Sequence, residues 1–207
     1  MMSNVDAVFA ATNNAELAMN YDKWAATYEN DLVGHGGPSE AVAELAKYVA
    51  SDARILDAGC GTGLVGQLLA EHGYSNLEGL DLSTGMLQQA TFKKCYNKLH
   101  QQVLGETLDF PDATFDAIII IGVFVMAHVR SNAFDELLRI TKPNGHIIFT
   151  LRPEFYDNTD FKSKMDALEK QGHWKFVAVT EPFHGRFKAH PDVNLQVWVY
   201  ERMFNFK

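Results

Sequence analysis

The sequence predicts a doubly wound α/β protein with a mostly parallel central sheet and helices on both of its faces. Short apolar runs alternate with segments of helical periodicity along the chain. The middle runs are apolar throughout, as strands covered by helices on both sides must be. A glycine-rich segment follows the first apolar run directly, where sheets of this kind bind ligands. Because 207 residues with 47% hydrophobic content can bury one sizeable core, we expect residues 1–207 to form a single domain.

Seven segments have the composition of strands. The run from 117 to 121 is apolar at every position, which predicts a strand in the middle of the sheet. The run from 195 to 204 alternates apolar and polar residues, which predicts a strand nearer the edge. The predicted strands lie near residues 54–57, 77–81, 103–104, 117–121, 146–150, 176–181 and 195–204.

The segments between these runs carry the periodicity and the end signals of helices. In residues 38–50 the apolar side chains recur on one helical face, and Gly73 is a natural C-cap for the helix before it. Ser83 and Ser131 have the hydroxyl groups that N-caps prefer. The predicted helices cover residues 38–50 and 63–72, two segments that begin at Ser83 and Ser131, and residues 160–172. The first 20 residues are compatible with either a helix or a mobile lid.

Three glycines stand directly after the first predicted strand, where a helix begins. Gly59, Gly61 and Gly63 allow the backbone to turn tightly and to approach a ligand closely. Residues 61–66 (GTGLVG) also spell the G-x-G-x-x-G motif of dinucleotide-binding proteins, and Asp81 follows at about the distance of that motif's ribose acid. The spelling alone is therefore compatible with an NAD(P)-dependent oxidoreductase.

Charge favours a different ligand. Asp57 ends the first strand, and we expect its carboxylate to face the occupant of the glycine loop. A pyrophosphate beside a carboxylate in a partly desolvated cleft would be repelled. S-adenosylmethionine (AdoMet) carries an ammonium group and a sulfonium but no phosphate, so this loop favours AdoMet over a dinucleotide.

Several motifs, in order along the chain, resemble those of class I AdoMet-dependent methyltransferases. The upstream segment 21–28 (YDKWAATY), together with residues 94–96 and 121–124, is similar to the methyltransferase-like proteins associated with the Williams-Beuren chromosomal region. The resemblance implies a Rossmann-like methyltransferase fold with a seven-stranded sheet and AdoMet as cofactor. The class-wide motifs are residues 55–63 (ILDAGCGTG), 80–87 (LDLSTGML), 110–117 (FPDATFDA) and 142–145 (KPNG).

The same resemblance implies roles for individual residues. Residues 1–37 would cover the cofactor, and residues 38–207 would form the core. Asp81 would accept hydrogen bonds from both ribose hydroxyls, and Tyr21 and Tyr28 would flank the sulfonium. Asp57 would lie near the methionine end, and Ser83 and Met86 would border the adenine. The other implied contacts are Gly59, Cys60, Gly61, Gly63, Leu82, Gly105, Glu106, Ile121, Gly122 and Val123.

Two departures from the family pattern stand out. After the third strand, methyltransferases of this type often place an Asp near the adenine amino group, whereas residues 103–106 read VLGE here. Leu104, Gly105 and Glu106 are the candidates for that contact. Asn144 stands where a glycine is common, and we expect this to affect turn geometry only.

Methyl transfer is a direct displacement, in which the alignment of the acceptor matters more than a strong base. His128 and Tyr21 are the candidate proton acceptors, although a lone histidine is more often a structural donor. The acceptor is either a small molecule or a protein, and a small molecule is favoured. A non-catalytic, regulatory AdoMet-binding protein on the same scaffold is the other interpretation.

Charge and composition limit the partners and the location. A formal net charge of -8 disfavours nucleic acid. Two cysteines without a C-x-x-C spacing predict neither a metal site nor a disulfide framework. The first 20 residues contain no Lys or Arg, and the longest apolar run, 117–127, is too short to span a bilayer. We therefore expect a cytoplasmic protein, and the sequence does not indicate its oligomeric state.

Overall fold

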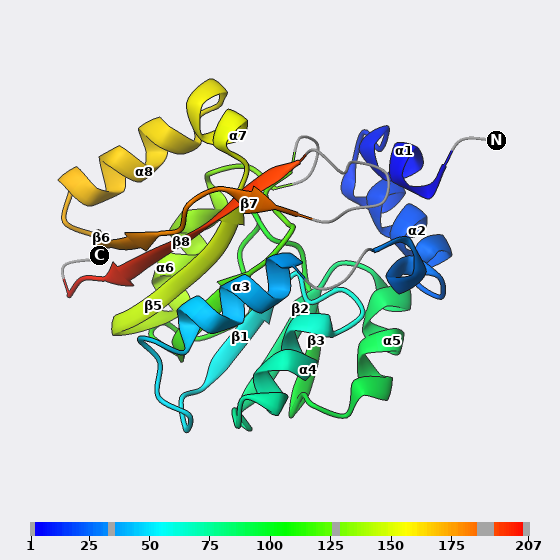
Figure 1. Ribbon diagram of the computed structural model, residues 1–207, viewed down its shortest axis with the longest axis horizontal. Helices are drawn as coiled ribbons and strands as arrows, with labels where there is room; N and C mark the ends of the chain where they lie inside the picture. Colours follow the sequence, from blue (N-terminus) through cyan, green and yellow to red (C-terminus); the bar gives the residue numbers. More distant parts are fainter. Residues whose placement is uncertain (1–2, 33–35, 126–128, 186–192, 205–207) are drawn as a thin grey trace.

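The computed structural model describes residues 3–32, 36–125, 129–185 and 193–204. A central β-sheet is flanked by helices on both faces (Figure 1), which confirms the predicted fold class. The strands are β1 (Ile55–Ala58), β2 (Leu77–Asp81), β3 (Lys98–Gln101), β4 (Phe115–Ile120), β5 (Thr141–Leu151), β6 (Trp174–Val179), β7 (Phe183–His184) and β8 (Asn194–Arg202).

The strand order creates a crevice at one edge of the sheet. The strands run in the order β3-β2-β1-β4-β5-β8-β6, and the short β7 pairs with β8. Strands β1 to β5 are mutually parallel, whereas β8 runs antiparallel between β5 and β6. Strand β2, which follows β1 in the chain, lies on one side of β1 in the sheet, and β4 lies on the other side. The loops after β1 and β4 therefore diverge at the carboxyl edge, which is where doubly wound sheets bind ligands.

Helices cover both faces of the sheet because the central strands are apolar on both sides. Ile118 and Ile120 of β4 pack in one core cluster with residues of α6 and α8. Their neighbours Ala117 and Ile119 pack on the opposite face with residues of α3 and α4. The helical elements are α1 (Asn4–Phe9), α2 (Asn14–Trp24), the 3₁₀ helix η1 (Tyr28–Asp31), α3 (Gly36–Leu45), α4 (Leu64–Glu71), α5 (Thr84–Lys93), α6 (Ala133–Ile140), α7 (Pro153–Asn158) and α8 (Phe161–Lys170).

The third strand was predicted at the wrong place. It lies at residues 98–101, where it pairs with residues 78–81 of β2, whereas Leu104 makes only an isolated bridge to Glu106. β3 is an edge strand of sequence KLHQ with no fully buried position. An edge strand of this kind needs no apolar run, so the hydrophobic pattern did not mark it.

Smaller differences concern the ends of elements. Asn132 rather than Ser131 precedes α6, and the Ser131 hydroxyl instead donates to Asp160. Neither α7 nor β7 was predicted. Asn144 has a φ of 62° within the irregular register between β4 and β5, a left-handed conformation that Asn tolerates better than most residues. This agrees with the expectation that its replacement of glycine affects turn geometry only.

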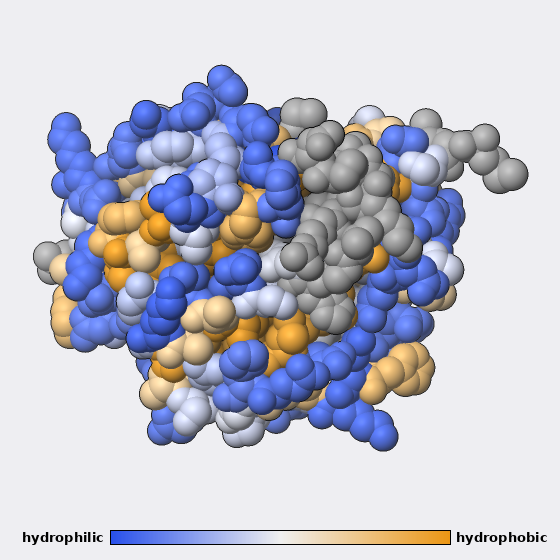
Figure 2. Space-filling model, viewed as in Figure 1, coloured by the Kyte–Doolittle hydropathy of each residue, from blue (hydrophilic) through white to orange (hydrophobic). Residues whose placement is uncertain are grey.

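The N-terminal segment, residues 3–32, is largely helical and contains α1, α2 and η1. Val8, Leu17 and Trp24 form a small core of their own, and α2 packs beside α5 (Figure 1). The space-filling view shows a largely hydrophilic surface with scattered apolar side chains (Figure 2). No helix in the described ranges is long and apolar enough to cross a membrane.

Candidate cofactor-binding site

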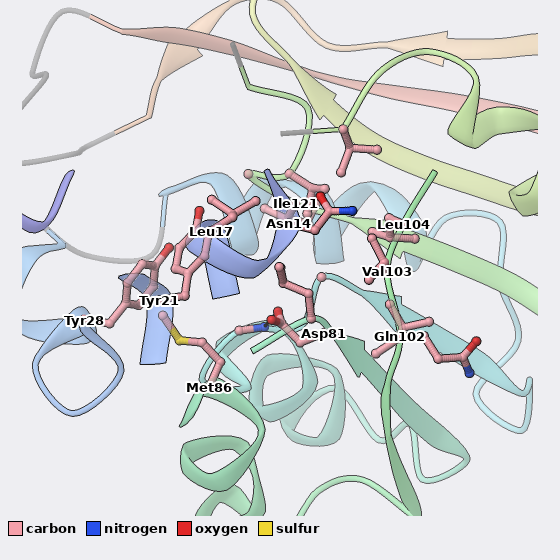
Figure 3. Close-up of a pocket in the computed structure, with 17 residues that line it drawn as sticks. Asn14, Leu17, Tyr21, Tyr28, Asp81, Met86, Gln102, Val103, Leu104 and Ile121 are labelled. Atoms are coloured by element: carbon pink, nitrogen blue, oxygen red, sulfur yellow. Dashed lines mark hydrogen bonds between the residues drawn. The ribbon is translucent and has the colours of Figure 1, made fainter. Parts of the chain in front are cut away.

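A pocket lies at the carboxyl edge of the sheet, beneath the N-terminal segment. Figure 3 shows Tyr21 and Tyr28 on one side of it, Val103 and Leu104 on the other, and Asp81 between them. The glycine loop, the ends of β2, β3 and β4, and helix α2 all contribute to its wall. The lining residues are Asn14, Leu17, Tyr21, Tyr28, Gly59, Gly61, Leu80, Asp81, Leu82, Met86, Gln102, Val103, Leu104, Ile121, Gly122, Val123 and Val129.

The three glycines of the loop have different tasks. All have positive φ, between 53° and 91°, a conformation that residues with a Cβ rarely adopt. A Cβ on Gly61 would meet no atom within 4 Å, so this glycine borders open space. A Cβ on Gly59 would lie 2.3 Å from Val123 Cγ2, and one on Gly63 would lie 3.2 Å from the backbone of α5 at Ala90. Gly59 and Gly63 therefore also permit close packing within the protein.

The backbone N–H groups of the loop are largely committed to the protein itself. Those of residues 59 and 60 donate to the Leu80 carbonyl at 2.7 and 2.9 Å. The Gly61 N–H donates to Asp81 Oδ2 at 2.9 Å, and that of Gly63 donates to the Cys60 carbonyl at 2.9 Å. A dinucleotide loop holds pyrophosphate through such N–H groups. This loop has four of them already paired, which disfavours a phosphate ligand.

Asp81 is the acidic group of the pocket. Its Oδ1 accepts from the Ser83 N–H at 2.9 Å, and its Oδ2 accepts from Gly61. Burial raises the pKa of Asp81, and the hydrogen bonds from Ser83 and Gly61 oppose that effect. Each carboxylate oxygen can accept more than one hydrogen bond. The two carboxylate oxygens of Asp81 can therefore still accept hydrogen bonds from two hydroxyl groups of a ligand.

Asp22 attaches the N-terminal segment to the start of α5. Its Oδ1 accepts from the Ser83 hydroxyl at 2.6 Å and from the Gly85 N–H at 2.7 Å. A carboxylate is favourable at a helix N-terminus, where N–H groups lack partners in the helix. Burial raises the pKa of Asp22, but these hydrogen bonds outweigh burial and leave the pKa below its usual value. Ser83 also caps α5, because its Oγ accepts from the Met86 N–H at 3.0 Å, as predicted.

The aromatic residues of the N-terminal segment divide between core and pocket. Trp24 is buried, and its Nε1 donates to Asp31 Oδ2 at 2.7 Å. Tyr21 stacks beside Trp24 at 6.3 Å between ring centroids, and Tyr28 meets Trp24 edge-on at 4.8 Å. Only the two tyrosines reach the pocket. Burial raises the pKa of Tyr21 well above its ordinary value, so its hydroxyl stays protonated at neutral pH, which argues against Tyr21 as a proton acceptor.

Asp57 does not face the pocket, contrary to the expectation from the sequence. Its side chain is 1% exposed, and Oδ2 accepts from the Tyr96 hydroxyl at 2.5 Å. Within the part of the chain that the structure describes, Oδ1 has no hydrogen-bond partner. The argument that Asp57 repels a pyrophosphate directly is therefore wrong. The paired N–H groups of the loop replace it as the structural reason to disfavour a dinucleotide.

Tyr96 explains the third glycine of the GTGLVG sequence. The Gly66 N–H donates to the Tyr96 hydroxyl at 3.2 Å, and a Cβ on Gly66 would lie 2.2 Å from Tyr96 Cζ. Gly66 is thus required for the packing of a tyrosine thirty residues away. The resulting chain of contacts, from Gly66 through Tyr96 to Asp57, holds the glycine loop from below.

The buried carboxyl of Asp57 should make stability depend on pH. Burial raises its pKa from 3.8 to about 7, although the Tyr96 hydrogen bond opposes the shift. Between these two values the folded protein holds a proton that the unfolded chain has lost. The contribution of Asp57 to stability therefore falls as the pH rises through this window. In chemical denaturation, the unfolding free energy of the wild type minus that of Asp57→Asn should decrease from acid to neutral pH. A constant difference would contradict the raised pKa.

Most of the predicted contacts lie together. Those that line the main pocket are Tyr21, Tyr28, Gly59, Gly61, Asp81, Leu82, Met86, Ile121, Gly122 and Val123. Cys60 lines an adjoining pocket, which shares Tyr28, Gly59 and Ile121 with the first and extends toward Leu195. Asp57, Gly63, Gly105 and Glu106 line neither pocket, and His128 lies outside the described residues.

Sequence reasoning missed several lining residues. Asn14 and Leu17 come from the N-terminal segment, whose structure had been left open, and Gln102 and Val103 follow the misplaced third strand. Of the three candidates for the adenine amino contact, Leu104 lines the pocket, whereas Gly105 and Glu106 do not. Within the described ranges, no group of three or more His, Cys, Asp or Glu residues could hold a metal ion.

The strand order, with β8 inserted antiparallel, and the acidic residue at the end of β2 beside a glycine loop define a class of protein. The chain belongs to the class I AdoMet-dependent methyltransferases. Residues 56–149 match the family model described as a methyltransferase domain. Human methyltransferase-like protein 27 is 38% identical over 165 residues, which cover 75% of this chain and 66% of that protein.

Solved structures share the fold over most of the chain. The [4+2]-cyclase SpnF aligns with a TM-score of 0.71 and 15% identity, covering 93% of this chain and 97% of that one. Magnesium protoporphyrin IX methyltransferase from Synechocystis aligns with a TM-score of 0.68 and 17% identity, covering 93% and 99%. The chain spans less than two thirds of the length of the curated relatives, from 66% of the human protein to 26% of a Yarrowia lipolytica sterol 24-C-methyltransferase.

Proposed function

We propose that the protein transfers a methyl group from AdoMet to a small-molecule acceptor. The observation that carries this proposal is the pairing of Asp81 with a glycine loop in which four N–H groups are already engaged. Such a site offers a carboxylate to a ribose but offers few donors to a phosphate. It suits a nucleoside that carries a cationic rather than a phosphorylated tail.

The lining residues suggest how AdoMet would lie. Asp81 would receive the two ribose hydroxyls, and Leu82 and Met86 would supply apolar contacts for the adenine. Tyr21 and Tyr28 would cover the methionine end, where electron-rich rings stabilise a sulfonium and exclude water. AdoMet supplies the methyl group and its leaving group, so the chain's own contribution is to align the acceptor and keep the site dry. A proton-accepting role for His128 stays a prediction.

The acceptor class rests on charge and on similar proteins. Relatives are named for a sterol acceptor, and a neighbour in structure is named for a porphyrin. The net charge of -8 gives a surface that repels nucleic acid. A small acceptor therefore fits better than a phosphate-rich polymer.

A second candidate is a protein of this fold that binds the nucleoside but performs other chemistry or none. The structural similarity to SpnF, a [4+2]-cyclase, supports this second candidate, because the fold alone does not determine the reaction.

Ligand protection provides the first test. S-adenosylhomocysteine at about 100-fold its Kd should add about 2.7 kcal/mol to the unfolding free energy, and NAD at the same concentration should add nothing. This is measured by thermal and chemical denaturation. Protection by NAD without protection by S-adenosylhomocysteine would refute the proposal. Incubation with methyl-labelled AdoMet and fractionated cell extract then separates the two candidates, because only a methyltransferase labels a fraction.

A further inference from the structure

One polar residue of the main pocket comes from the N-terminal segment and has no role in the proposal above. Asn14 is the first residue of α2, and in Figure 3 its amide lies near Ile121 and Leu104. Its Nδ2 donates to Glu106 Oε1 at 3.0 Å, a contact between residues 92 positions apart in the sequence. Glu106 does not itself line the pocket.

This contact fixes which way the amide of Asn14 points. An ionised carboxylate only accepts hydrogen bonds, so the amide nitrogen must face Glu106. The carbonyl oxygen Oδ1 is then the free end of the amide. Within the described ranges, Oδ1 receives no hydrogen bond from the protein. Asn14 is an exposed residue that lines the pocket, so its carbonyl oxygen is available as an acceptor.

Among the described side chains that line the pocket beside the loop after β3, Asn14 supplies the free amide carbonyl. The wall after β3 is formed by the apolar side chains of Val103 and Leu104. Gln102 also lines the pocket, but its Oε1 already accepts from the Asp109 N–H at 2.7 Å. The free end of Gln102 is thus a donor.

We propose that Asn14 accepts a hydrogen bond from the 6-amino group of the cofactor's adenine, and that Glu106 is the positioning residue that orients the Asn14 amide for it. This inference rests on the proposed function, because it assumes that the pocket binds an adenine nucleoside. It assigns adenine selectivity to the N-terminal segment rather than to the loop after β3.

The test compares S-adenosylhomocysteine with S-inosylhomocysteine, in which a carbonyl replaces the 6-amino group. Binding is measured by isothermal titration calorimetry. A site that hydrogen-bonds the amino group rejects the analogue, since two acceptors would then face each other. We expect the wild type to prefer the adenine ligand by about tenfold or more. Asn14→Leu should bring the two Kd values to within about twofold, mainly by weakening the adenine ligand.

A second variant is designed to reverse the orientation of the Asn14 amide while keeping the Asn14 side chain. Glu106→Lys replaces an obligate acceptor by an obligate donor, so the Asn14 carbonyl should turn toward Lys and the amide nitrogen toward the ligand. The preference should then shift toward the inosine ligand. The two ligands carry the same charge, so their affinity ratio is insensitive to the altered electrostatic field. Glu16→Gln is the matched control, since Glu16 lies on the same helix, does not line the pocket and accepts hydrogen bonds from Thr12.

The outcomes separate this inference from the proposed function. If the wild type and Asn14→Leu discriminate equally between the two ligands, the role of Asn14 is refuted while the pocket assignment stands. An unchanged ratio in Glu106→Lys would refute the positioning role of Glu106. If the wild type binds neither ligand, the proposed function fails, and the inference fails with it.

Discussion

Asp81→Asn should weaken the binding of S-adenosylhomocysteine by about 100-fold, because two charge-assisted hydrogen bonds are lost together. In the wild type, the two carboxylate oxygens accept from the N–H groups of Gly61 and Ser83. The side-chain amide of the variant has one oxygen and one nitrogen, and the nitrogen would face one of these two N–H donors. The variant therefore loses one backbone hydrogen bond and one of the two acceptor oxygens for the ribose hydroxyls. Isothermal titration calorimetry measures the affinity.

The control for this variant is Asp112→Asn, which alters an exposed carboxylate paired with Arg139 at 2.8 Å, outside the pocket. Its affinity should match that of the wild type, and both variants should keep the near-ultraviolet circular dichroism of the folded protein. Affinity in Asp81→Asn within about threefold of the wild type would show that the carboxylate does not hold the ribose.

Gly66→Ala should lower the unfolding free energy by about 2 to 3 kcal/mol, as expected for an overpacked core. The added Cβ would lie 2.2 Å from Tyr96 Cζ and 2.3 Å from its hydroxyl oxygen. The ring has no easy route away, because its hydroxyl donates to Asp57 at 2.5 Å and it also packs against Gly63 and Gly79. Denaturant titration measures the loss.

A double-mutant cycle identifies the cause of that loss. In a Tyr96→Ala background the alanine at position 66 has room, so the same substitution should cost much less. Gln67→Ala, on the surface side of the same helix, controls for the effect of alanine on α4 and should be nearly neutral. Equal costs of Gly66→Ala in both backgrounds would show that Tyr96 is not the obstacle.

Hydrophobic pattern predicted the middle of the sheet well because it reports burial. Strands β1, β2 and β4 are almost entirely buried, and their apolar residues made them easy to find although each also contains a carboxylate. The same pattern failed for β3, since an edge strand pairs through its backbone while its side chains stay partly exposed. Register and neighbours, which local sequence does not carry, determine the position of such a strand.

The candidate site shows the same limit. The spelling of the loop located Gly59, Gly61 and Asp81, whose roles follow from strand ends and turn geometry. It could not tell a glycine that borders a ligand from one that accommodates a tyrosine, as Gly66 does for Tyr96. The direction of the Asp57 side chain likewise depends on that distant partner. Contacts such as Asn14 with Glu106 depend on how the N-terminal segment docks, which no local motif encodes.

The attachment of Asp22 to the start of α5 also positions one wall of the pocket. Tyr21 and Leu17 line that pocket, and they lie on the same helix as Asp22, α2. Lifting α2 breaks the hydrogen bonds from Ser83 and Gly85. A carboxylate that does not itself line the pocket thus helps to hold two of the pocket's side chains in place.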